Sequence, residues 1–232
     1  MCGRYLLKEI EAIDKVVREV FGFGLNLERP RYNVAPSQLV PTVAADEDGT
    51  PRPTQMRWGL VPFWERTEKP KLAPINARAE DALTKPMFRQ ALQRRRCVIP
   101  ADGFYEWKRI NPETKVPHLI QRTKGRPFFF AGIFEPATPT RPETCLVFTT
   151  RPNELMAGIY DRMPVILDDA SAKAWIQPGA MRAEELATFA SPFPADQMQA
   201  RRVSRLVNNV RNDGPEILTT EEELLIQDDL FS

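Results

Sequence analysis

Cys2 is the residue of this chain that is best suited to covalent chemistry. Aminopeptidases remove an initial methionine when the second residue is small, so Cys2 is expected to become the N-terminal residue. Its α-amine would then have a pKa of about 7.7–8.0 and its thiol one of about 8.5. The amine can form an imine with an aldehyde, and the thiolate can close a five-membered thiazolidine on the imine carbon. Taken alone, the position favours a cysteine without a chemical role.

An amide, a guanidinium and a carboxylate elsewhere could assist this chemistry. Asn76 and Arg78 are two residues apart and share one side if the backbone is extended. Asn76 could orient a sugar hydroxyl or a carbonyl, and Arg78 could hold a phosphate in a fork. Glu106 stands among aromatic residues, where burial would raise its pKa and suit it to general acid–base catalysis. Each could also be an ordinary surface residue.

Cysteine and histidine counts narrow the function classes. The three cysteines, Cys2, Cys97 and Cys145, are far apart, which argues against a disulfide framework. His118 is the single histidine. A structural zinc site needs about four ligands, so no metal and no cofactor are expected. A thiol peptidase of the papain type needs a Cys–His pair, and no motif pairs His118 with Cys2.

The composition is that of an ordinary globular protein. Hydrophobic residues make up 42% and charged residues 27% of the 232 residues, and the net charge is +1. We find neither an apolar run of about 18 residues nor a signal peptide, so a cytosolic location without a membrane contact is expected. Basic residues gather at 94–96 and between Arg201 and Arg211. These runs are either solvated faces or a local phosphate-binding patch.

Hydrophobic periodicity predicts an α+β fold. Helices are expected at 8–22, at 79–95 with an interruption at Pro86, and near 153–158, 169–176 and 183–190. Asp168 or Asp169 could cap the fourth of these, and 112–115 is expected to form a hairpin turn. Short apolar segments without regular βαβ alternation favour a strongly curved, barrel-like mixed sheet flanked by short helices. They are 39–44, 55–58, 97–100, 104–108, 118–121, 128–134, 146–149 and 165–167.

No internal repeat or low-complexity linker divides the chain. We therefore predict a single domain over residues 1–220. The stretch 221–232 is expected to be an acidic C-terminal tail that frays.

A series of motifs in chain order resembles the SOS response-associated peptidase (SRAP) family, whose members process abasic sites. The motifs are MCGRY at 1–5, RYNVAP at 31–36, RWGL at 57–60, NARAE at 76–80, RCVIPADGFYEW at 96–107 and VNNV at 207–210. Together they extend over nearly the whole chain. Each motif is weak by itself, but their order makes the resemblance specific.

The resemblance implies that Cys2 crosslinks to the ring-opened deoxyribose of an abasic site in single-stranded DNA. The crosslink matures to a thiazolidine that shields the lesion during the DNA damage response. Glu106 would assist ring opening and reversal, Asn76 would position the sugar, and Arg78 and Arg162 would bind flanking phosphates. The family is also credited with lyase activity through the imine and with a self-peptidase activity that exposes the cysteine.

The implied partner is single-stranded DNA that contains abasic sites. Phe63 and Trp64 follow Val61-Pro62 and are either core residues or side chains that stack on bases. Candidate phosphate contacts come from Arg4, Arg78, Arg89 and Arg162. Three or four contacts would give a salt dependence with a slope of about −0.7 per contact. We expect a monomer that associates with the nucleoid when it is bound to DNA.

Two other functions remain open at this point. A non-catalytic module that binds single-stranded DNA explains the arginines and aromatic residues but leaves Cys2, Asn76 and Glu106 without a role. A thiol peptidase acting on other proteins lacks a histidine partner for Cys2. His118 belongs to another strand segment, and we interpret it as a partly buried strand residue.

One position departs from the family motif Ile-His-Asp-Arg-Met-Pro. The chain has Tyr160 where the family has a catalytic histidine, in Ile159-Tyr160-Asp161-Arg162-Met163-Pro164. A phenol with a pKa of about 10 cannot exchange protons near neutral pH as an imidazole with a pKa of about 6.5 can. Proton transfer at the leaving sugar oxygen should therefore be weaker here, while the phosphate contacts persist.

We predict that Tyr160→His accelerates formation or reversal of the crosslink. The measurement is the rate of both steps with an abasic oligonucleotide. If neither rate changes, Tyr160 does not limit formation or reversal of the crosslink.

Overall fold

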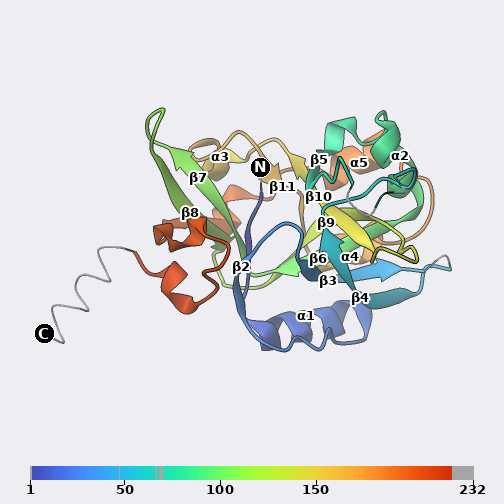
Figure 1. The fold of residues 1–232 in the computed structure, drawn as a ribbon, viewed down its shortest axis with the longest axis horizontal. Coiled ribbons are helices and arrows are strands. Elements are labelled where there is room, and N and C mark those ends of the chain that lie inside the picture. Colours follow the sequence, from blue (N-terminus) through green and yellow to red (C-terminus); the bar gives the residue numbers. More distant parts are fainter. Residues whose placement is uncertain (1, 47, 66, 68–69, 221–232) are drawn as a thin grey trace, which may run out of the picture.

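The computed structural model describes residues 2–46, 48–65, 67 and 70–220. The predicted acidic tail at 221–232 lies outside the described residues. Figure 1 shows two β-sheets with short helices packed around them, which confirms the predicted α+β class. Within the described part of the chain, none of the helices has the length and apolar character needed to cross a membrane.

Five strands of the larger sheet close into a ring. They follow the order β10-β4-β3-β6-β9, and β9 pairs again with β10. Only the β4–β10 contact in this ring is parallel, so the predicted curved, mixed, barrel-like sheet is confirmed. Strands β5 and β11 add to β10, and β12 adds to β9. The bounds are Leu39–Ala45 (β3), Pro51–Trp58 (β4), Asn76–Arg78 (β5), Arg96–Ala101 (β6), Phe128–Glu135 (β9), Thr144–Thr150 (β10), Met163–Pro164 (β11) and Ile166–Leu167 (β12).

The smaller sheet is antiparallel and has the order β13-β8-β7-β1-β2. Its strands are Tyr5–Leu7 (β1), Arg31–Val34 (β2), Gly103–Arg109 (β7), Lys115–Arg122 (β8) and Met198–Arg202 (β13). The predicted β7–β8 turn is confirmed, and the Asn111 side chain accepts the N–H groups of Glu113 and Thr114 at 3.0 and 2.7 Å.

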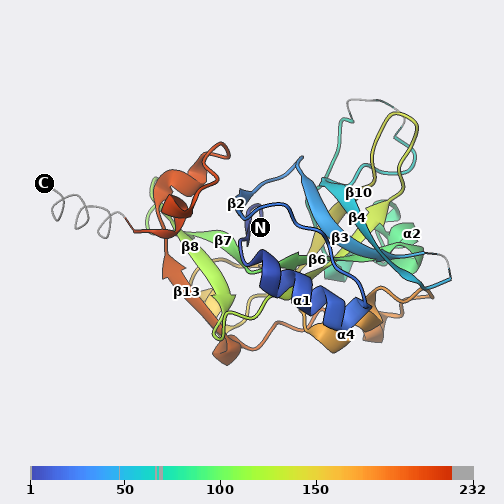
Figure 2. The ribbon, with the colours of Figure 1, turned by 90° about the horizontal axis from the view of Figure 1, so that it is seen from below.

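The helices are Ile10–Phe21 (α1), Pro86–Arg94 (α2), Glu154–Ala157 (α3), Asp169–Trp175 (α4) and Ala183–Phe189 (α5). Short 3₁₀ turns lie at Ala79–Asp81 (η1), Ala195–Gln197 (η2), Arg205–Asn208 (η3) and Pro215–Leu218 (η4). Figure 2 shows α1 and α4 side by side against the barrel.

Local chemistry explains where these helices begin and end. Gly22 follows α1 with a φ of 86°, a conformation that glycine adopts without strain. Asp168 caps α4 by accepting the N–H of Ser171 at 2.9 Å, as predicted. The predicted helical stretch at 79–95 with an interruption at Pro86 is confirmed from Pro86 onward, where α2 begins with Pro86 in its first turn, whereas 79–81 forms only the 3₁₀ turn η1.

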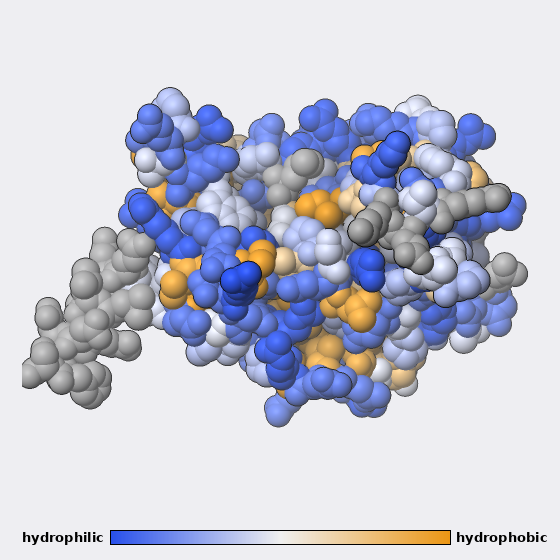
Figure 3. Space-filling view, viewed as in Figure 1, coloured by the Kyte–Doolittle hydropathy of each residue, from blue (hydrophilic) through white to orange (hydrophobic). Residues whose placement is uncertain are grey.

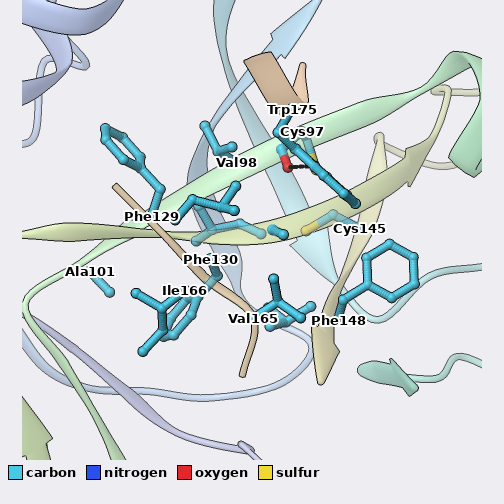
Figure 4. Close-up of a cluster of buried hydrophobic side chains, with 14 of the residues drawn as sticks. Cys97, Val98, Ala101, Phe129, Phe130, Cys145, Phe148, Val165, Ile166 and Trp175 are labelled. Atoms are coloured by element: carbon cyan, nitrogen blue, oxygen red, sulfur yellow. Dashed lines mark hydrogen bonds between the residues drawn. The ribbon is translucent and has the colours of Figure 1, made fainter. Parts of the chain in front are cut away.

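The barrel core surrounds Trp175, whose indole N–H donates to the carbonyls of Cys97 and Gly132, both at 3.0 Å (Figure 4). Arg96 is buried beside it and donates to four carbonyls, those of Leu92, Trp175, Gln177 and Gly179. The basic run at 94–96 is therefore neither a uniform solvated face nor a phosphate patch, and only Arg94 is exposed.

Asp102 connects the junction of the two sheets to α1. Its Oδ2 accepts the backbone N–H groups of Lys8 and Glu9, at 2.6 and 2.9 Å, directly before the helix begins. Burial raises the pKa of this carboxyl group to about 6, against the effect of the two hydrogen bonds. Asp102 thus anchors the two residues that lead into α1.

We predict that Asp102→Asn flattens the pH dependence of stability. The ordinary pKa of 3.8 lies below the folded value of about 6, so between them the folded state keeps a proton that the unfolded state loses. Wild-type stability should fall across this window by about 3 kcal/mol from this group, whereas asparagine has no such proton.

The measurement is urea unfolding of both proteins from pH 4 to pH 7. The asparagine variant should gain stability relative to wild type as the pH rises. A difference that stays constant over this range would contradict the assignment.

Candidate active site

Cys2 lies three residues before the first residue of β1, at the junction of the two sheets. Figure 1 shows this dark blue strand beginning between the β7–β8 hairpin and the barrel strands β10 and β11. The Cys2 side chain is only 1% exposed. Asn76, the first residue of β5, donates from its side-chain nitrogen to the Cys2 carbonyl oxygen at 2.8 Å. The fold therefore joins two of the predicted catalytic residues across 74 positions of sequence.

The amide oxygen of Asn76 is also buried, and none of the described residues donates a hydrogen bond to it. Leaving such an acceptor unsatisfied costs about 1–3 kcal/mol. Unsatisfied buried polar atoms are rare in proteins and call for an explanation. Here the oxygen can accept a hydroxyl of a molecule bound beside Cys2.

Glu106 lies in the middle of β7 and is 2% exposed. Burial raises its pKa against the lowering effect of a hydrogen bond from the Trp107 backbone N–H, and the Asp161 carboxylate adds a smaller increase. Burial also raises the pKa of the Cys2 thiol, with an added contribution from the Glu106 charge. Glu106 and Cys2 are therefore within electrostatic reach of each other. A thiol in this environment is neutral and needs a base to take its proton before it can attack.

Tyr160 follows α3 and is half-buried against the barrel core. Burial raises the pKa of its phenol, and the charges of Glu106 and Asp161 raise it further. The four predicted catalytic residues Cys2, Asn76, Glu106 and Tyr160 are thus brought together around one buried position. The phenol can donate a hydrogen bond there, but its raised pKa keeps it from acting as a base near neutral pH.

Two of the predicted phosphate-binding arginines are engaged by the protein itself. Arg4 donates to the Asn33 side chain at 3.0 Å and to the Val207 carbonyl at 2.6 Å. Arg162 forms a two-pronged ion pair with Glu80, at 2.9 and 2.8 Å, and donates to the Thr149 carbonyl at 2.7 Å. A phosphate could bind the two terminal nitrogens of Arg162 only by displacing the Glu80 carboxylate.

The other predicted DNA contacts are exposed. The guanidinium of Arg78 donates no hydrogen bond to any of the described residues, and the backbone around Arg78 is extended. Phe63 and Trp64 are 55% and 49% exposed, with their rings edge to face at 4.9 Å. A cleft of about 490 Å³ is lined by Phe63, Arg89, Arg94 and polar side chains of α2. In Figure 3 the apolar side chains of the visible face form small separate patches among polar ones.

Three residues near the site were not predicted from the sequence to belong to it. Glu80 and Thr149 hold Arg162, and His118 lies opposite Glu106 in the register of β7 and β8. His118 is a partly buried strand residue, as predicted. Its position beside Glu106 depends on strand register, which no sequence motif indicated.

The sequence model of the family described as SOS response associated peptidase (SRAP) matches residues 1–210. The chain belongs to the SRAP family. This SRAP protein is 44% identical over 225 residues to the abasic site processing protein YoqW of Bacillus subtilis, covering 94% of this chain and 99% of YoqW. It is 35% identical over 194 residues to the abasic site processing protein YedK of Escherichia coli, covering 81% and 83% of the two chains.

The fold of this SRAP protein is also that of solved structures. A crystal structure of a Bacteroides thetaiotaomicron protein matches with a TM-score of 0.77 and 25% identity, over 93% of this chain and 99% of the other. A Bordetella bronchiseptica protein matches with a TM-score of 0.73 and 25% identity, over 88% and 100% of the two chains.

We predict that Arg4→Ala destabilises this SRAP protein by about 1–3 kcal/mol, because it leaves the buried Asn33 oxygen without its donor and removes one of the two donors to the Val207 carbonyl. Arg78→Ala is the matched control, since an exposed side chain without partners should change stability by less than about 0.5 kcal/mol. Urea unfolding of both variants measures this. Equal effects would show that Arg4 does not anchor the C-terminal segment.

Proposed function

We propose that this SRAP protein processes abasic sites in single-stranded DNA by forming a covalent thiazolidine with Cys2, after removal of Met1. The observation that carries the proposal is the convergence on Cys2. Asn76 donates to its carbonyl oxygen, and the Glu106 charge acts on its thiol. The names of the relatives, which call them abasic site processing proteins, supply the substrate class.

The proposed reaction joins the aldehyde of the ring-opened sugar to the α-amine and thiol of Cys2. The amine attacks the aldehyde carbon, the resulting imine forms with loss of one water, and the thiol adds to the imine carbon while its proton moves to nitrogen. The Glu106 carboxylate serves first in sugar ring opening and then as the base for the thiol. The free amide oxygen of Asn76 accepts a sugar hydroxyl, which orients the carbonyl towards the amine.

In this proposal DNA binding uses the exposed groups first. Phe63 and Trp64 stack on or wedge between bases, and Arg78 and Arg89 contact phosphates. Arg162 contributes a phosphate contact when DNA displaces Glu80, and Arg4 holds the segment that carries Cys2. The protein acts as a monomer in the DNA damage response and shields the lesion.

Lyase activity through the imine and self-removal of Met1 complete the proposed activities. The rival function, a non-catalytic module for single-stranded DNA, draws support from the exposed Phe63–Trp64 pair but gives no role to the contacts of Cys2. A thiol peptidase that cleaves other proteins is disfavoured, because burial and Glu106 raise the pKa of the Cys2 thiol, whereas such enzymes need a thiolate.

The test is the intact mass of the purified protein after incubation with an abasic oligonucleotide. We expect protein without Met1 to form an adduct whose mass is the sum of the two components minus one water. Cys2→Ala should abolish the adduct and leave non-covalent binding within about twofold of wild type, since the exposed contacts remain.

Cys145→Ala is the matched thiol control. Cys145 is buried in the barrel core, so the adduct should persist in this variant. If protein with a free Cys2 terminus forms no adduct, the proposed function is wrong. Binding without an adduct would favour the non-catalytic module.

A further inference from the structure

Strand register places a histidine next to the buried carboxylate of the site. In the smaller sheet Glu106 of β7 is directly opposite His118 of β8, which is opposite Arg202 of β13. Directly opposite residues of antiparallel strands project from the same face, with Cβ atoms about 4.5–5.5 Å apart. The neighbouring pair Phe104 and Ile120 belongs to the barrel core. Glu106 and His118 therefore share the face that turns towards Cys2.

The His118 ring has one defined donor and one defined acceptor. Its Nδ1 lies 2.9 Å from the carbonyl oxygen of Val116. A carbonyl oxygen can only accept, so Nδ1 carries the hydrogen and Nε2 of the neutral ring has a free lone pair. His118 thus presents a base on the face that it shares with Glu106.

Charged groups around His118 come from both neighbouring strands. Glu106 and Lys108 face it from β7, and Arg202 faces it from β13. Burial lowers the pKa of His118, the charges of Arg202 and Lys108 lower it further, and the hydrogen bond to Val116 raises it. The ring is therefore neutral at pH 7 and able to take up a proton.

We propose that His118 is a positioning residue that acts through Glu106, relaying protons between this carboxylate and solvent during crosslinking. The proposal rests on the proposed function of Cys2. Tyr160 cannot serve as this relay, because burial and the Glu106 charge raise its pKa.

The relay leaves atoms and charge balanced. Aldehyde and neutral aminothiol combine to thiazolidine and one water, without oxidation or reduction. When the amine starts as an ammonium group, one additional proton must leave. The Glu106 carboxylate takes this proton from nitrogen and passes it through an intervening water to Nε2 of His118, and the imidazolium releases it to solvent. Both side chains then return to their starting states.

The first test compares wild type with His118→Gln, both without Met1, in crosslinking to an abasic oligonucleotide from pH 5.5 to pH 8.5. We expect the rate at pH 7 to fall roughly tenfold, which is less than the loss of a direct general acid or base because His118 acts through Glu106, and we expect one ionisation to disappear from the pH profile. Added imidazole should restore the rate of His118→Ala. Arg122→Gln, which removes a charge elsewhere on β8, is the control and should leave rate and profile unchanged.

The second test does not depend on crosslinking. Because the chain has a single histidine, its NMR titration can be assigned without ambiguity. We expect the Nδ1-protonated tautomer, a lower His118 pKa in Glu106→Gln, and a higher one in Arg202→Gln.

The outcomes separate the two proposals. If wild type forms an adduct and His118→Gln forms it at the same rate with the same pH profile, the relay is wrong and the proposed function stands. A His118 titration that is unaffected by Glu106→Gln also overturns the relay. If wild type forms no adduct, the proposed function fails and the relay fails with it.

Discussion

The hydrogen bond from Asn76 to the Cys2 carbonyl holds the start of the chain against the barrel. Terminal residues fray unless they are tied to the fold, so a reactive group at a terminus needs such an anchor. Two residues further on, Arg4 fastens the same segment to Asn33 and to the Val207 carbonyl. The burial of Cys2 and its proximity to Glu106 follow from these contacts. These hydrogen bonds hold Cys2 in a fixed position although it lies close to the end of the chain.

The second constraint is electrostatic. Glu106, the Cys2 thiol and the Tyr160 phenol are all acids, and all three have raised pKa values, mainly because of burial. Cys2 and Glu106 are almost completely buried, so a proton that leaves one of them must go first to a nearby group. Such a site favours stepwise proton transfer over free thiolate chemistry. This agrees with a reaction in which the amine attacks first and the thiol follows.

Much of the fold could be predicted because apolar residues dominate it. The continuous apolar run at 128–134 and the periodicity of 8–22 correspond to β9 and α1. Strand β13 was missed because its sequence, MQARR, is polar and was interpreted as a basic run. Strands β1 and β5 were missed because three residues are too few to show alternation.

For the site, motifs indicated which residues to consider but not their partners. Both Arg78 and Arg162 were predicted to bind phosphate because both are basic. Arg78 is exposed, whereas Arg162 already forms an ion pair with Glu80. The proximity of Glu106 and His118 depends on the register of a hairpin, and the contacts of Arg96 depend on where three segments end. Such information exists only after the chain has folded.

Ring closure of the barrel has a consequence for contacts between copies of the protein. A closed ring has no unpaired backbone edge onto which a foreign strand could add. Strands β11 and β12, which extend it, have two residues each, too few to template a new strand. The smaller sheet has two edge strands: β2, which has four residues, and β13, where Arg201 and Arg202 would repel an identical strand laid alongside. The architecture that holds Cys2 thus also limits edge-to-edge aggregation.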